Sequence, residues 1–264
     1  MTNGNSLADS DVNIVHPTIH KISLVDLKDA LKKGVADFNA APTHFLFLAL
    51  IYPMVTLVIA RVYAGYEVLP LVFPLLAGYT LIGPLAATGM YELSRRREQG
   101  LDHAWWHVFE VLRSPSFRSI AILGLMLMVF YFAWLGTAQA IYVWFFGAAV
   151  PASVMGFVAD VFTTRPGWGM IIVGSGAGFI FATVVFTLSV VSFPLLLDRD
   201  AGPMSAIQTS IRVVVANPLT LGIWGLFIAA ALLVGSLPFF FGLAVVVPVI
   251  GHASWHLYRK TVEW

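Results

Sequence analysis

Residues 198–225, DRDAGPMSAIQTSIRVVVANPLTLGIWG, carry the pattern from which the organisation of the whole chain can be read. The Gly-Pro pair at 202–203 suits a helix entry, because proline at the first helical position loses no backbone donor that the helix needs. The Asn-Pro pair at 217–218 ends this helix, since the residue before proline is disfavoured in the α region. The sequence then turns apolar. The stretch predicts an amphipathic helix at the membrane surface, followed directly by a membrane span.

Side chains of this helix separate by face at 3.6 residues per turn. The polar face is predicted to carry Ser205, Thr209 and Arg212. Much of the remaining surface is apolar and carries Ala206, Ile207, Ile211 and Val214. This arrangement is typical of a helix that lies on a bilayer.

The composition places the chain in a bilayer. Of its 264 residues, 59% are hydrophobic and 11% are charged, whereas soluble domains carry about 25% charged residues. Cysteine is absent, which excludes disulfide frameworks and cysteine-based metal sites. A net charge of +1 gives no indication of nucleic-acid binding. The N-terminus lacks a continuous apolar core and a small-residue cleavage site, so we expect no signal peptide.

The predicted fold is an all-α integral membrane protein with six transmembrane helices in three hairpins, each hairpin preceded by an amphipathic cytoplasmic helix. Residues 1–22 predict a flexible cytoplasmic arm, and residues 23–41 predict an amphipathic cytoplasmic helix that opens with a capping box. Residues 42–264 form a single membrane domain. Its spans, each near the roughly 20 residues that a crossing needs, are expected at about 44–64, 68–91, 117–139, 170–196, 218–236 and 238–257.

Lysine and arginine indicate the orientation. Nearly all of them lie in the N-terminal region, the 92–118 and 198–217 loops and the C-terminal tail, whereas the opposite side holds only Arg61 and Arg165. By the positive-inside rule both termini are cytoplasmic. Segment 140–168, on the periplasmic side, is aromatic and apolar, and it predicts a half-buried interfacial helix.

The cytoplasmic helices share a short repeat, polar–Ala–x–x–polar. It occurs from Asp29, His103, Ser205 and His252, and in the first three copies a proline follows after 12 or 13 residues. Internal repetition of this kind is common in membrane proteins. The alternative is that any helix at a membrane surface acquires such a pattern.

Two runs, LLLDRDAGPMSAIQTSIRVVVANPLTLGIWG and the closing PVIGHASWHLYRK, resemble a family of bacterial integral inner-membrane proteins known only as domain of unknown function 2189. There is a looser likeness to other six-span bacterial families. The resemblance extends from about residue 22 to the end. It implies a location in the bacterial inner membrane and brings no established activity.

Two histidine pairs are the main candidates for chemistry. His103 and His107 are predicted on one helical face with Glu110, and His252 and His256 on one face with Arg259. Histidines at this spacing can bind a divalent metal. More simply, both pairs face water or lipid headgroups. We expect no tight four-histidine cluster, and we expect headgroup contacts from Arg259 and Trp255.

No other site emerges from the sequence. The predicted spans contain no Asp, Glu or Lys expected to be buried, so no residue is available to carry a proton or ion. Glu92 and Arg61 are expected to snorkel at span ends. We predict a structural or accessory component of a membrane assembly, without enzyme activity, cofactor or nucleic acid. Its expected partners are membrane lipids and either further copies of itself or a larger inner-membrane complex. An alternative is a channel or carrier for a small uncharged solute or lipid, lined by Thr56, Tyr79, Thr80, Tyr131, Gln139, Ser175, Thr183, Thr187 and Ser192.

Overall fold

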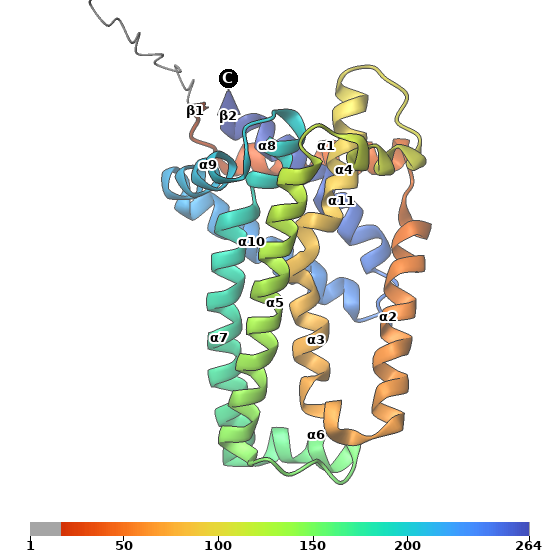
Figure 1. The fold of residues 1–264 in the computed structure, drawn as a ribbon, viewed down its shortest axis with the longest axis vertical. Coiled ribbons are helices and arrows are strands. Elements are labelled where there is room, and N and C mark those ends of the chain that lie inside the picture. The colour runs from red at the N-terminus through yellow and green to blue at the C-terminus, as the bar shows by residue number, and fades with distance from the viewer. Residues whose placement is uncertain (1–16, 264) are drawn as a thin grey trace, which may run out of the picture.

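The computed structural model describes residues 17–263, without the side chains at positions 44, 45, 50, 63 and 79. Helices make up nearly all of it (Figure 1). In chain order, with η for a 3-10 helix, the elements are β1 Thr18–Ile19, α1 Leu24–Ala40, α2 His44–Ala64, η1 Tyr66–Leu71, α3 Val72–Gly78, η2 Tyr79–Ile82, α4 Gly83–Glu98, η3 Trp105–Arg113, α5 Phe117–Phe146, α6 Val154–Thr163, α7 Arg165–Ser189, α8 Ser192–Asp198, α9 Pro203–Ala216, α10 Pro218–Ser236, α11 Leu243–Thr261 and β2 Val262–Glu263.

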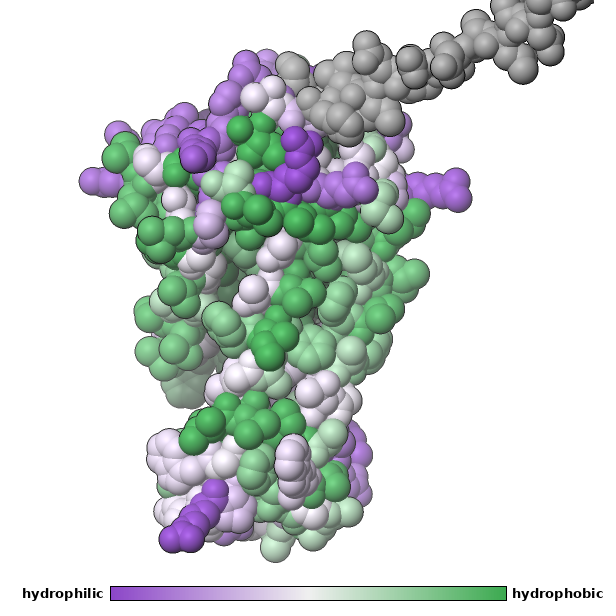
Figure 2. All heavy atoms as spheres, turned by 90° about the vertical axis from the view of Figure 1, so that its left-hand side faces the viewer, coloured by the Kyte–Doolittle hydropathy of each residue, from purple (hydrophilic) through white to green (hydrophobic). Residues whose placement is uncertain are grey.

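Among the described residues, four helical stretches are long and apolar enough to cross a membrane: Tyr66–Glu98, Phe117–Phe146, Arg165–Asp198 and Pro218–Ser236. The apolar part of α2, Leu46–Val62, is shorter. A hydrophobic zone lies between a hydrophilic upper end and a mixed lower end (Figure 2). Large apolar side chains are exposed along all the long helices, which fits lipid rather than water as the surrounding solvent. The chain is therefore an integral membrane protein with a helical membrane part.

The last predicted hairpin, 218–236 and 238–257, does not run the full length of the molecule. The hydroxyl of Tyr52, near the middle of α2, donates to the Phe239 carbonyl at 2.9 Å. The turn between α10 and α11 is therefore level with the middle of α2, and it lies well above the lower ends of α2, α3, α5 and α7 (Figure 1). Backbone groups of the turn bond locally, as a turn without access to water requires. The hairpin therefore reaches only partway down the molecule, and the predicted sixth span is not confirmed.

The predicted periplasmic segment 140–168 is shortened, because both neighbouring helices extend into it. Helix α5 continues to Phe146, and α7 begins at Arg165. Between them α6 lies across the lower ends of the long helices (Figure 1). The hydroxyl of Ser153 caps α6 by accepting from the Gly156 amide at 3.0 Å. No residue of α6 is buried, so it lies on the end of the bundle as an interfacial helix does.

The densest packing is at the end that holds β1 and β2, rather than among the long helices. There α1 crosses α11 so closely that a Cβ on Gly34 would lie 2.6 Å from the Ala253 backbone nitrogen. Phe193, Trp255 and Tyr258 are buried in the main hydrophobic cluster at this end. Helices in a bilayer can leave apolar surface to lipid, because lipid tails are as apolar as the side chains. The protein core therefore lies at the upper end.

The two ends of the described chain are joined. Strand β1 pairs antiparallel with β2. The Asn217 side chain accepts from the Ile22 amide at 2.8 Å and donates to the His20 carbonyl at 3.1 Å. The flexible arm predicted over 1–22 is therefore wrong for its last residues, which are held against the C-terminus, and residues 1–16 lie outside the described part.

Helix α9, the centre of the sequence pattern, packs by its small and polar residues. Thr209 and Ser210 are buried, and the Ser210 hydroxyl donates to the Thr187 carbonyl in α7 at 2.8 Å. Met204 and Val215 are exposed. The prediction that Thr209 shares one face with Arg212 is wrong, because Thr209 is buried whereas Arg212 is exposed. Outward apolar side chains suit a helix at a membrane surface.

Candidate functional site

Asp37 is the centre of a buried polar cluster that joins α1, α4 and α11. The residue is 5% exposed. Its Oδ2 accepts from Ser94 Oγ at 2.6 Å and lies 2.7 Å from His256 Nε2. Its Oδ1 accepts a hydrogen bond from Arg97. Because both oxygens have polar or charged partners, the cost of burying the carboxylate is offset.

His252 lies beside this cluster and is fully buried. Its Nδ1 is 2.8 Å from Ser94 Oγ. The part of α11 from Gly251 onward packs at the upper end and lies outside the membrane-crossing stretches. Burial lowers the pKa of His252 from its ordinary 6.5 to about 4, with the nearby Asp37 charge opposing the shift. His252 is therefore neutral at pH 7.

The environment of Asp37 keeps it ionised. Burial acts to raise its pKa, but hydrogen bonds from His256 and Ser94 hold the pKa below its ordinary 3.8. The carboxylate thus stays charged opposite Arg97 at neutral pH. An open pocket of about 320 Å³ adjoins the cluster and is lined by Lys33, Ala36, Asp37, Ser94, Arg97, Glu98 and His256.

The Ser94, His252 and Asp37 trio differs from a nucleophilic relay. A catalytic serine donates its proton to a histidine base, which a carboxylate then orients. Here the Ser94 hydroxyl donates directly to Asp37, and both Ser94 and His252 are buried. The arrangement holds helices together and does not present a reactive oxygen.

A second network joins α11 to α4 and α8. The Trp255 indole donates to Glu98 Oε2 at 3.2 Å. Arg259 lies 3.4 Å from Glu98 Oε1 and 3.4 Å from Asp198 Oδ2, and the Tyr258 hydroxyl donates to Asp198 at 2.8 Å. The predicted headgroup contact of Trp255 is wrong, because its ring is enclosed by protein. Arg259 is partly exposed but is paired within the chain.

Glu92 does not snorkel into solvent as predicted. It is buried and accepts two hydrogen bonds from Arg95, each at 2.9 Å. Arg96 Nη1 lies 3.8 Å from the same carboxylate. At the opposite end, Arg61 is exposed and pairs with Glu67 at 2.8 Å. The Glu92 pair therefore stabilises the upper end of α4 from within the protein.

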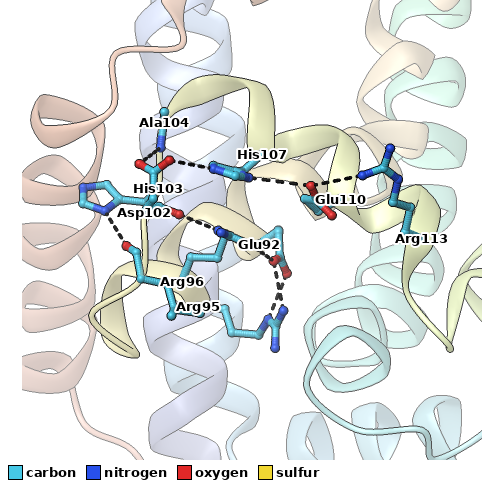
Figure 3. Close-up of polar contacts among 10 residues, drawn as sticks. Glu92, Arg95, Arg96, Asp102, His103, Ala104, His107, Glu110 and Arg113 are labelled. Carbon is cyan, nitrogen blue, oxygen red and sulfur yellow. Dashed lines mark hydrogen bonds and ion pairs between the residues drawn. The ribbon is translucent and has the colours of Figure 1, made fainter.

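The other histidine pair belongs to a different network, drawn in Figure 3. Because η3 is a 3-10 helix that begins only after His103, the predicted common helical face of His103 and His107 is wrong. His107 Nε2 lies 2.9 Å from Asp102 Oδ2, and its Nδ1 lies 3.8 Å from Glu110 Oε1. His107 thus joins the preceding loop to η3.

The structure does not bring the four histidines together. His103 and His107 lie in the loop-and-η3 network, whereas His252 and His256 lie in the Asp37 cluster. Among the described residues, no group of three or more His, Cys, Asp or Glu side chains is placed to hold a metal ion. The sequence placed the pairs at one end but did not identify their partners.

Sequence reasoning missed Asp37 as the central residue. The spacing of residues along α1 was a usable signal. The residues that the structure buries in this helix are Leu27, Ala30, Gly34 and Asp37. They recur every three or four residues, which is the spacing of one helical face. A carboxylate that continues a stripe of small and apolar residues indicates a buried partner on another helix.

Several residues proposed to line a polar path bond to their own helix or lie at the surface, and the Tyr79 side chain is outside the described part. Thr183 donates to the Phe179 carbonyl and Thr187 to the Thr183 carbonyl, each at 2.8 Å within α7. Gln139 and Ser175 are exposed. Hydroxyls that bond to their own helix need no aqueous path to be satisfied.

Comparison with known proteins agrees with the membrane assignment. Residues 72–198 match the model of a family described as "Predicted integral membrane protein (DUF2189)". The match runs from α3 through α8, and over these residues it confirms the resemblance seen in the sequence. A search of curated proteins and a search of solved structures found no match to this chain. The family description indicates no specific activity.

Proposed function

We propose that this chain is a structural or accessory component of a bacterial inner-membrane assembly, formed with copies of itself or with other membrane proteins. The observation that carries the proposal is that the polar groups of the Asp37 cluster bind one another across three helices. Its carboxylate binds side chains of α4 and α11, and the adjoining Ser94 hydroxyl is buried. A cluster of this kind fixes helices in place rather than presenting groups to a substrate. Catalysis is not part of the proposal.

The proposal predicts a particle larger than one chain. Extraction with a polymer that retains native lipid, followed by mass photometry, should give a species containing several copies or a fixed partner. Exposed side chains on α6 and along the long helices supply the surface for such contacts. A single-chain particle with no partner at stoichiometric level, both in polymer discs and in mild detergent, would rule the proposal out.

The proposed orientation has both termini in the cytoplasm. Crossings by α2, Tyr66–Glu98, α5 and α7, together with a re-entrant α10–α11 hairpin, return the chain to its starting side. The cluster of arginines at 95–97 supports a cytoplasmic upper end.

Reporter fusions test this topology. Fusions after Lys33, Gln99, Ala201 and Trp264 should read cytoplasmic, and one at Asp160 should read periplasmic. Because the chain has no native cysteine, single cysteines can refine the result. Asp160→Cys should react with a membrane-impermeant maleimide in whole cells and Leu237→Cys should not. A periplasmic reading at Gln99 would refute the orientation, and maleimide labelling at 237 would restore the full sixth span.

A further inference from the structure

The nine residues of η3, WWHVFEVLR, form three sides, because a 3-10 helix repeats every three residues. The first side consists of Trp105, Val108 and Val111, of which Val108 and Val111 are buried and Val108 packs on α4. The second is polar, is linked by ion pairs (Figure 3), and consists of His107, Glu110 and Arg113. The third is apolar and consists of Trp106, Phe109 and Leu112, which are 53%, 54% and 60% exposed. One face of this short helix is therefore large, apolar and uncovered.

The depth of η3 follows from its contact with α4. A Cβ on Gly89 would lie 2.9 Å from Val108 Cβ. Gly89 precedes Arg95 by six residues, which is about 9 Å along a helix. Val108 also belongs to a cluster with Phe47, in the first turn of the apolar helix α2. Val108, in the middle of η3, is therefore level with the part of α4 that lies about 9 Å before Arg95. Figure 1 shows residues 105–113 lying across the direction of the long helices.

Cationic side chains adjoin this apolar face. Arg113 is 82% exposed, and its one ion pair with a described residue is distant, 3.6 Å to Glu110. Arg118, in the first turn of α5, is exposed and forms no ion pair with any residue that the structure describes. A hollow of about 250 Å³ on this surface is lined by Trp106, Phe109, Glu110, Leu112 and Arg113. The single carboxylate in the lining faces both His107 and Arg113.

We propose that η3 is a lipid-binding element for anionic phospholipid of the cytoplasmic leaflet. Trp106, Phe109 and Leu112 lie among the upper parts of the acyl chains. Amphipathic helices at a membrane surface commonly place Trp, Phe and Leu side chains at this depth. Arg113 and Arg118 contact the phosphate of the headgroup. On the polar side, Glu110 and Arg113 reach water, whereas His107 is mostly enclosed by protein. This assignment does not depend on the proposed assembly, but its choice of the cytoplasmic leaflet rests on the proposed orientation.

Neighbouring residues on two sides of η3 provide a matched test of depth. Phe109→Cys and Glu110→Cys, made in the cysteine-free full chain, carry a nitroxide label after reconstitution in phosphatidylethanolamine–phosphatidylglycerol vesicles. The label at 109 should collide more with oxygen, which concentrates in lipid, and the label at 110 more with a water-soluble nickel chelate. Equal nickel accessibility at both positions would place η3 in water. Shielding of position 109 from both reagents would show that protein covers it, and either result would overturn the proposal.

The headgroup contact has its own test. Spin-labelled phosphatidylglycerol should associate with the protein more than spin-labelled phosphatidylcholine. Arg113→Gln and Arg118→Gln should each reduce that preference by about fivefold, the equivalent of about 1 kcal/mol per arginine near the surface. Arg165→Gln, an exposed arginine at the other end, should leave it unchanged. An equal loss in the Arg165 variant would indicate non-specific attraction. Loss of the preference in millimolar inorganic phosphate would indicate a phosphate-ion site. Both results would contradict the lipid assignment.

Discussion

Asp37→Ala should lower the free energy of unfolding by about 3–5 kcal/mol, the usual cost of removing one partner from a buried charged pair. The substitution leaves Arg97 without its carboxylate and takes away the acceptor for Ser94 and the partner of His256. For a chain of this size, each kcal/mol moves the unfolding temperature by roughly 2–4 °C. The midpoint should therefore fall by roughly 10 °C, measured by tryptophan fluorescence on heating in detergent.

Asp29→Ala is the matched control for this variant. Asp29 is on the same helix and pairs with Lys33 and Lys260, but it lies at the surface. Exposed ion pairs contribute little to stability, because water and salt screen them. The control removes the same charge, so it should shift the unfolding temperature far less than the change at Asp37. Equal shifts in the two variants would show that the buried cluster contributes nothing beyond the net charge of α1.

The helical membrane class and most helix starts follow from local sequence. Proline and asparagine signals set the junction at 217–218, and apolar length predicts spans at 117–139 and 170–196, which lie within the candidate crossings Phe117–Phe146 and Arg165–Asp198. These features depend only on residues that are close together in the sequence. Proline restricts the backbone of the residue before it, and a crossing needs an unbroken apolar run. A single sequence carries enough information for them.

The partners of Asp37 required a different kind of information. Ser94 is 57 positions away and His256 is 219 positions away. Nothing in helical periodicity says which distant helix an inward carboxylate will meet. The close crossing at Gly34 made the contact between α1 and α11 possible, but a glycine also occurs at helix caps and turns, where no second helix approaches. The sequence predicted the ends of the helices and not their neighbours.

Two further differences between prediction and structure concern the helical period of residues 105–113 and the reach of the α10–α11 hairpin. Residues 105–113 were read with a helical period of 3.6, whereas the structure has a 3-10 helix with a period of three. That change separates His103 from His107 and gathers Trp106, Phe109 and Leu112. Likewise, apolar length predicts a sixth span but carries no information on how far a hairpin reaches, and the Tyr52 contact with Phe239 puts its turn level with the middle of α2.

Acidification between pH 6.5 and 4 should destabilise the protein through His252. Its pKa is about 4 in the folded state against an ordinary 6.5, so in this range the unfolded chain binds a proton that the folded chain does not. Stability is therefore complete above pH 6.5 and is lost as the pH falls toward 4. At about 1.36 kcal/mol for each pH unit, the loss approaches about 3 kcal/mol. Unfolding temperatures measured from pH 7.5 to 4 should show this decline.

His252→Asn separates this effect from those of other groups. Asparagine keeps a polar group near Ser94 but cannot gain a proton, so its unfolding temperature should start lower at pH 7.5 and fall less between pH 6.5 and 4. The carboxylates with a lowered pKa, Asp37 and Asp26 among them, affect stability in a lower pH range. Their stabilisation is present above their ordinary 3.8 and is lost only below it. An equally steep decline in the His252 variant above pH 4 would show that another group is responsible.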